Sequence, residues 1–210
     1  MIKSVTFAVV ALAAVVGATR AEAAPIYASS VISANSTGVT ANGGAISSDR
    51  LIGAAALGDL AATTPGSVGF YSLGFGGSLT LGFSSLFGPG TATFLEATGG
   101  TFYPREAADI FVFDVAAAAF VFAGTVDNQP VGSNDTLSFA GLCSQGCSAL
   151  RFVDTSSIGD FSGLPSADGY DVNAVSVTAF QTNRVPEPGS LALLGLGLAG
   201  LAAIRKRKQA

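Results

Sequence analysis

The stretch Ser78-Leu-Thr-Leu-Gly-Phe83 alternates apolar residues with small or polar ones and places Leu79, Leu81 and Phe83 on one side. Alternation with a period of two is typical of a β-strand that buries one face. Six further short runs, rich in β-branched and aromatic residues and separated by turn-forming residues, follow along the chain. They are 91–97, 109–115, 119–126, 135–139, 149–153 and 171–180. The series predicts an all-β fold, an antiparallel, jelly-roll-like β-sandwich.

The beginning of the sequence has the pattern of an export signal. Lys3 precedes an apolar run over residues 5–17, and Ala21-Glu-Ala23 supplies the small residues that signal peptidase requires. We therefore interpret residues 1–24 as a signal peptide, with a buried N-terminal helix as the alternative. Residues 25–183 form the predicted extracytoplasmic domain, in which an Ala- and Leu-rich run at 48–62 is the best candidate for one short helix.

The end of the sequence combines an apolar segment with a basic cluster. Residues 189–204 contain no charged residue, and a helix of that length is about 24 Å long, short of the roughly 30 Å hydrocarbon core. The basic cluster that follows can reach the lipid headgroups and supply much of the difference. It consists of Arg205, Lys206, Arg207 and Lys208. We predict a transmembrane helix whose basic end stays in the cytoplasm, which places the domain outside.

A Pro-Glu-Pro element precedes this helix. The four residues are Val185, Pro186, Glu187 and Pro188, and the two prolines keep the chain extended where a protease could bind it. Together with the apolar segment and the basic cluster, residues 185–208 resemble the PEP-CTERM sorting signal, and we assign 184–208 to it. The resemblance implies recognition by an exosortase in the inner membrane of a Gram-negative bacterium. Cleavage near the Pro-Glu-Pro element would release the domain to the cell surface or to an exopolysaccharide (biofilm) matrix. The alternative is a plain stop-transfer anchor.

The charge of the predicted domain restricts its partners. Between residues 25 and 184 the chain has four arginines, no lysine and twelve acidic residues, a net charge of −8 against −4 for the whole sequence. An acidic surface without a basic patch argues against binding of nucleic acid or of anionic lipid headgroups. It is compatible with binding of cations or of neutral sugars.

The two cysteines, Cys143 and Cys147, lie close together in the sequence. Because a signal peptide implies an oxidising compartment, we predict that they form a small-loop disulfide. Metal binding is the competing interpretation, but it needs further soft or imidazole ligands, and the sequence has no other Cys and no His.

Four segments carry a second resemblance, to secreted bacterial domains with a galactose-binding-like or discoidin-like β-sandwich. They are 71–83, 98–106, 151–155 and 166–175, within a region of similarity from about 45 to 180. The resemblance implies a shape that often holds carbohydrate and a structural calcium ion. The chain departs from the pattern at residues 116–122, where a polar hairpin is expected and the sequence begins Ala116-Ala-Ala-Ala-Phe120.

Asp154, Asp168 and Asp171 are the candidate calcium ligands, because they lie with Asp160 and Asn173 in a short stretch rich in oxygen donors. The competing role of such aspartates is to accept hydrogen bonds from neighbouring backbone N–H groups at strand ends. An extracellular polysaccharide is the other candidate ligand. Aromatic residues that could stack on a sugar, but that are more often packed in a core, are Tyr71, Phe102, Tyr103 and Tyr170.

The sequence gives little support for catalysis. It contains no histidine to serve as the base of a nucleophilic triad. The two glutamates of the domain, Glu96 and Glu106, have no spacing that predicts the opposed carboxylates of a glycosidase. Our leading hypothesis is a non-enzymatic, exosortase-processed surface or matrix protein with a structural or carbohydrate-binding sandwich. The alternative is an envelope polysaccharide hydrolase that uses Glu96 and Glu106.

Overall fold

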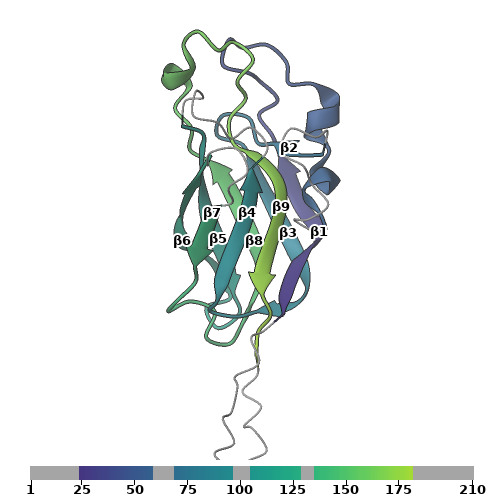
Figure 1. The fold of residues 1–210 in the computed structure, drawn as a ribbon, viewed down its shortest axis with the longest axis vertical. Coiled ribbons are helices and arrows are strands. Elements are labelled where there is room, and N and C mark those ends of the chain that lie inside the picture. The colour runs from purple at the N-terminus through teal and green to yellow at the C-terminus, as the bar shows by residue number, and fades with distance from the viewer. Residues whose placement is uncertain (1–23, 59–68, 97–104, 129–134, 182–210) are drawn as a thin grey trace, which may run out of the picture.

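A computed structural model describes residues 24–58, 69–96, 105–128 and 135–181 of the chain (Figure 1). The predicted signal peptide, apart from Ala24, and the predicted sorting signal at 184–208 lie outside these residues. Within the described segments no helix is long and apolar enough to cross a membrane. The predicted transmembrane helix at 189–204 is outside the part of the chain that this finding covers.

The described residues form strands and three short 3-10 helices, as the sequence predicts for an all-β domain. The strands are β1 (Pro25–Asn35), β2 (Tyr71–Ser72), β3 (Ser78–Phe87), β4 (Thr91–Glu96), β5 (Ala107–Asp114), β6 (Ala119–Asp127), β7 (Asp135–Ser138), β8 (Cys147–Asp154) and β9 (Asp171–Thr178). The 3-10 helices are η1 (Ser48–Leu51), η2 (Gly53–Ala56) and η4 (Ile158–Phe161).

The strands build two layers that share β1. One layer has the order β6-β5-β8-β3-β1 and the other the order β1-β9-β4-β7, with β2 paired to the start of β9 (Figure 1). Every ladder between the strands is antiparallel. The chain changes layer at every connection from β2 to β9 except the one between β5 and β6, so strands distant in sequence become neighbours. The predicted all-β, antiparallel fold is confirmed, and the strands form a sandwich-like arrangement.

Strand β1 belongs to both layers. Its first three residues pair with β9, whereas the part from Ala28 to Asn35 pairs with β3 through two register shifts. The sequence interpretation did not include this strand, because PIYASSVISAN has no clean alternation and buries only Ala28 fully. Its bulges let one strand bend from one sheet into the other.

The core forms where the inward faces of the two layers meet. In β5 the alternation is regular: Ala108, Ile110 and Val112 are buried and the residues between them are half-exposed. Phe94 of β4 meets Phe152 of β8 edge to face across the sandwich, with ring centroids 5.7 Å apart. Burial of each such apolar side chain stabilises the folded state by about 1.5–3 kcal/mol relative to leaving it exposed. This gain explains why the alternating runs form the strands.

The single short helix expected at 48–62 is not formed in its described part. Residues 48–56 instead make the two 3-10 turns η1 and η2, which meet at Ile52 in an extended conformation. Gly53 packs its backbone against Val31 and Ala34 of β1, and the run lacks the apolar stripe that a longer helix would bury.

The two ends of the sandwich differ in construction. The base is defined here as residues 24–25, 84–90, 114–119, 139–147 and 179–181, which lie at the lower end in Figure 1. The distal end comprises the described loops at the opposite end, at 36–58, 69–77 and 155–170. The described chain enters and leaves at the base, where the Ala179 backbone N–H donates to the Ala24 carbonyl at 3.2 Å.

Candidate functional site

The aspartates predicted to bind calcium lie at the distal end, and two of them share an arginine. In η1, Arg50 Nη2 donates to Asp168 Oδ1 and to Asp171 Oδ2, both at 2.9 Å. Ser72 Oγ donates to the second oxygen of Asp168 at 2.8 Å, and the Arg50 guanidinium also lies 4.6 Å from the centre of the Phe70 ring. One guanidinium thus provides the positive charge that these two buried carboxylates need.

Asp154 is held separately, at the distal end of β8. Its carboxylate accepts hydrogen bonds from the backbone N–H groups of Gly76, Tyr170 and Ser156 and from the Ser156 hydroxyl, at 2.7–3.2 Å. Gly169 comes so close that a Cβ there would lie 2.7 Å from Asp154 Oδ2. The alternative that sequence reasoning offered, a strand-end aspartate that caps backbone N–H groups, describes Asp154 well.

Burial dominates the electrostatics of this end. It raises the pKa of the Asp168 carboxyl despite the opposing hydrogen bond from Ser72 and the charge of Arg50, and it likewise raises the pKa of Asp154. Across the described segments no group of three or more His, Cys, Asp or Glu side chains could hold a metal ion. Calcium binding stays a prediction, and the partners that these carboxylates already have do not favour it.

The other predicted site residues fall into two groups. Cys143 and Cys147 form the predicted disulfide, with Cα atoms 5.0 Å apart. Tyr71 and Tyr170 are fully buried, so these two sugar-stacking candidates belong to the core, whereas Phe102 and Tyr103 lie outside the described residues. Glu106 is also buried at 1 % exposure, and Glu96 ends β4 with a side chain that lies outside the described part.

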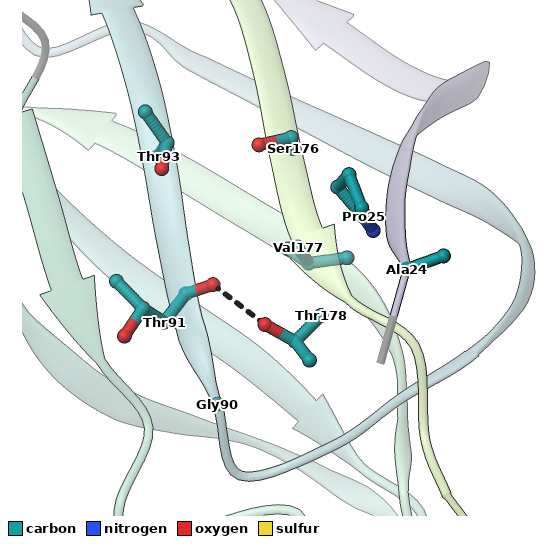
Figure 2. Close-up of a pocket in the computed structure, with 8 residues that line it drawn as sticks. All are labelled: Ala24, Pro25, Gly90, Thr91, Thr93, Ser176, Val177 and Thr178. Atoms are coloured by element: carbon teal, nitrogen blue, oxygen red, sulfur yellow. Dashed lines mark hydrogen bonds between the residues drawn. The ribbon is translucent and has the colours of Figure 1, made fainter. Parts of the chain in front are cut away.

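An open groove of about 560 Å³ lies on the layer formed by β1, β9 and β4 (Figure 2). Hydroxyl side chains dominate one side of it: Ser176 is paired with Thr93, and Thr178 Oγ1 donates to the Thr91 carbonyl at 3.2 Å. Ala24, Pro25, Gly90 and Val177 complete the lining. None of the described residues that line this groove is charged or aromatic, so their side chains offer a ligand only hydroxyl groups and a little apolar surface.

The outer face of the opposite layer carries four phenylalanines. In the β5–β6 ladder Phe111 pairs with Phe122 and Phe113 pairs with Phe120. The rings of each pair meet edge to face, with centroids 5.6 Å and 5.3 Å apart. Phe122 is 52 % exposed and the other three are half-buried. We call Phe111, Phe113, Phe120 and Phe122 the aromatic face.

A cation and a strip of small residues adjoin the aromatic face. Arg151 of β8 pairs with Phe111 and places its guanidinium 4.1 Å from the centre of the Phe120 ring. On its other side it pairs with Thr80 of β3, and the next pair outward along this face is Gly82 with Ala149. Sequence reasoning missed this site, although the run of alternate phenylalanines in 109–115 and 119–126 was its signal.

The comparisons concern the tail and the fold. Residues 184–208 match the PEP-CTERM protein-sorting motif, so the chain carries this motif where the sequence analysis placed it. The motif marks an exported protein that is anchored transiently in a membrane, processed by an exosortase and delivered to the cell surface or beyond. No curated protein sequence matches the chain.

Among solved structures the chain is similar to one described as truncated AlyQ with CBM32 and alginate lyase domains. The TM-score is 0.40 and the identity 8 %; the match covers 76 % of this chain and 35 % of that one. The chain therefore spans about a third of this neighbour, and a similarity of this size carries no argument about ligand or activity.

Proposed function

We propose that the protein is an exosortase-processed component of the cell surface or extracellular matrix whose β-sandwich binds a neutral polysaccharide without cleaving it. The sorting motif at 184–208 is the observation that carries the destination. The aromatic face with Arg151 supports the binding activity. Processing by an exosortase and binding of a polysaccharide are independent proposals and need separate experiments.

Processing is tested by the intact mass of the protein isolated from its native host. We expect a mass that lacks the signal peptide and everything beyond the Pro-Glu-Pro element, and an uncut tail in the Glu187→Ala variant. Asn183→Ala, just outside the matched residues, is the control and should be cut normally. A wild-type mass that retains Arg205 to Lys208 would make the protein a membrane-tethered domain and contradict this clause.

The binding clause follows from the chemistry of the aromatic face. Phenylalanine rings present apolar surfaces that suit the C–H faces of sugar rings, and guanidinium N–H groups donate to hydroxyl oxygens. The net charge of −8 on the domain opposes an acidic polysaccharide by like-charge repulsion, so a neutral one is favoured.

Affinity electrophoresis in native gels that contain neutral glucan or galactan tests this binding. We expect retardation of the wild-type protein and loss of retardation in Phe122→Ser. Ile158→Ser is a matched control, because Ile158 has the same 52 % exposure but lies in η4 at the distal end. Wild-type mobility that is the same with and without polysaccharide in every gel would contradict carbohydrate binding and leave a structural domain. Equal retardation of wild type and Phe122→Ser would show that the aromatic face is not the binding site.

No observation in the described residues favours the alternative hydrolase. A general acid must reach the glycosidic oxygen, and the Glu106 side chain is buried. Release of reducing ends from a matrix polysaccharide that disappears in both Glu96→Gln and Glu106→Gln would nevertheless establish hydrolysis and replace our proposal.

A further inference from the structure

The base of the sandwich is almost free of charge. Asp114 is the only Asp, Glu, Lys or Arg among the residues of the base, and its side chain is largely buried. Its carboxylate accepts hydrogen bonds from the backbone N–H groups of Ala116, Ala117 and Cys143, at 2.8–3.3 Å. The other charged residues of the described segments lie in the distal loops or in the strand halves leading to them, apart from Arg151 within β8.

The tip of the base is apolar and exposed. Val115 and Leu86 are each 39 % exposed, and the alanines at 116–119 of the β5–β6 hairpin are exposed as well. Val115 and Leu86 lie on either side of Gly146: the Val115 N–H donates to the Gly146 carbonyl at 3.1 Å, and a Cβ at Gly146 would lie 3.0 Å from Leu86. The hairpin that departs from the expected polar sequence is therefore part of an uncharged, partly apolar end surface.

The segments of the base are tied into one unit. Backbone hydrogen bonds of 2.9 Å join Phe139 to Gly90, Gly88 to Thr178 and Phe180 to Leu86. Asp114 and the disulfide fix the 139–147 segment against the hairpin. A surface held in this way keeps its shape without a partner.

The length of the chain beyond the base limits how far the base can lie from the membrane. The described residues end at Gln181, and the uncharged stretch of the sorting motif begins at Gly189. Eight residues span at most roughly 28 Å when fully extended. Gln181 itself is in the base, so in the anchored chain the base lies within that distance of the bilayer.

We propose that, while the precursor is anchored, the base rests on the outer surface of the lipid bilayer, with the Val115–Ala119 hairpin and Leu86 at the headgroup boundary. This inference rests on the anchoring that the sorting motif implies. Apolar, uncharged tips can enter that boundary at little cost, whereas carboxylates near anionic lipids are repelled.

The charge distribution supports the same orientation. The eight residues of β5 separate the base from the distal end by roughly 26 Å, at about 3.3 Å per residue. Screening at physiological ionic strength acts over about 8 Å, so the distal carboxylates lie several screening lengths from the lipid. The distal loops and their Arg50-centred cluster then point away from the membrane.

Site-directed spin labelling of the anchored precursor tests the contact. The full precursor is made in a host without exosortase and placed in vesicles of phosphatidylethanolamine and phosphatidylglycerol. A nitroxide is attached at Ala117→Cys in the base or, as the control, at Ser157→Cys in an exposed distal loop. The native cysteines are paired and do not react. Collision with a water-soluble nickel complex and with oxygen then reports depth at each site.

We expect the label at position 117 to collide severalfold less with nickel, and more with oxygen, than the label at 157. Val115→Asp should return the label at 117 to water, whereas Thr155→Asp at the distal end should not.

Equal nickel access at both sites in vesicle-bound protein would overturn the membrane contact of the base but leave the anchoring intact. Protection at 117 that appears only when exosortase is added would assign the base to that enzyme and also overturn it. Vesicle flotation is measured on the same samples, and precursor that does not float would overturn the anchoring and the inference together.

Discussion

The two ends of the sandwich use the same device in different surroundings. At the distal end Asp154, the last residue of β8, turns inward and accepts backbone N–H groups from the loops; at the base Asp114, the last residue of β5, does the same. Around Asp154 the chain adds long loops and a buried ion cluster centred on Arg50. Around Asp114 it adds short turns and a disulfide. Charge therefore organises the distal end, and backbone and covalent links organise the base.

The largest expected effect concerns the ion cluster. Arg50→Gln leaves Asp168 and Asp171 buried without their cation, and we expect the free energy of unfolding to fall by about 3 kcal/mol. Urea denaturation of the released domain measures it. Arg105→Gln is the control, since its pair with Asp127 is exposed and should contribute less than about 1 kcal/mol. Equal losses in the two variants would show that the Arg50 cluster does not stabilise the distal end.

The matching change at the base removes its organising carboxylate. Asp114→Ala leaves the fully buried Cys143 N–H without its acceptor and frees the hairpin, so we expect a loss of about 2 kcal/mol. Asp109→Ala, which removes a hydrogen bond to Thr125 on the surface of the same strand, should cost less than about 0.5 kcal/mol. Denaturation with an unchanged midpoint in Asp114→Ala would mean that the base is held by its turns alone.

The disulfide of the base should contribute slightly less. Replacing both Cys143 and Cys147 by serine opens a loop with a sequence separation of only four, for which restriction of the unfolded chain is worth at most about 2 kcal/mol. Thermal unfolding under non-reducing conditions measures the difference from wild type. A loss larger than that of Arg50→Gln would reverse the ranking of the two ends.

The smallest effect is a pH dependence confined to the distal end. Burial raises the pKa of the Asp154 carboxyl above 3.8, against the opposing hydrogen bonds from Tyr170 and Gly76. The folded protein then holds this proton more tightly than the unfolded chain, so the titration of Asp154 adds stability below pH 3.8 that is lost as the pH rises through the raised pKa. We expect the difference in unfolding free energy between wild type and Asp154→Asn to shrink as the pH rises through the raised pKa of Asp154.

Asp49 provides a control of opposite sign for this titration. A hydrogen bond from the Ser47 hydroxyl lowers the pKa of the exposed Asp49 carboxyl, so any stability that it contributes is present above pH 3.8 and is lost as the pH falls through the lowered pKa. The free energies of unfolding of Asp49→Asn and Asp154→Asn, measured against pH, should therefore diverge from wild type in opposite directions. Parallel curves for the two variants would contradict the assigned cause.

The strands that could be predicted are those whose alternation reflects burial. Leu79 and Leu81 are fully buried on one face of β3, and the six later runs correspond to β4 through β9. Strand β1 escaped prediction because it divides its pairing between two sheets and therefore buries little on either face. Local pattern carries the strand signal only where one side of a strand is consistently buried.

The site residues were harder to predict because their partners are distant in sequence. Arg50 meets Asp168 and Asp171 across 118 and 121 positions, which no local spacing reveals. Tyr71 and Tyr170 are candidates for sugar stacking by residue type alone, and both are in the core, which is the commoner place for such residues. The aromatic face depends on the register of two strands, which pairs Phe111 with Phe122 and Phe113 with Phe120.

The strand order has a consequence for the timing of export. β1 and β4 are joined within their layer only through β9, the last strand in the described residues. A chain that emerges from a translocation channel with its N-terminal end first cannot complete that layer until residues 171–178 have passed. Closing contacts between such distant segments is slow compared with local folding. The sandwich therefore closes only when the sorting motif, a few residues behind β9, is itself arriving at the membrane. The strand order thus couples the completion of folding to the arrival of the sorting motif at the membrane.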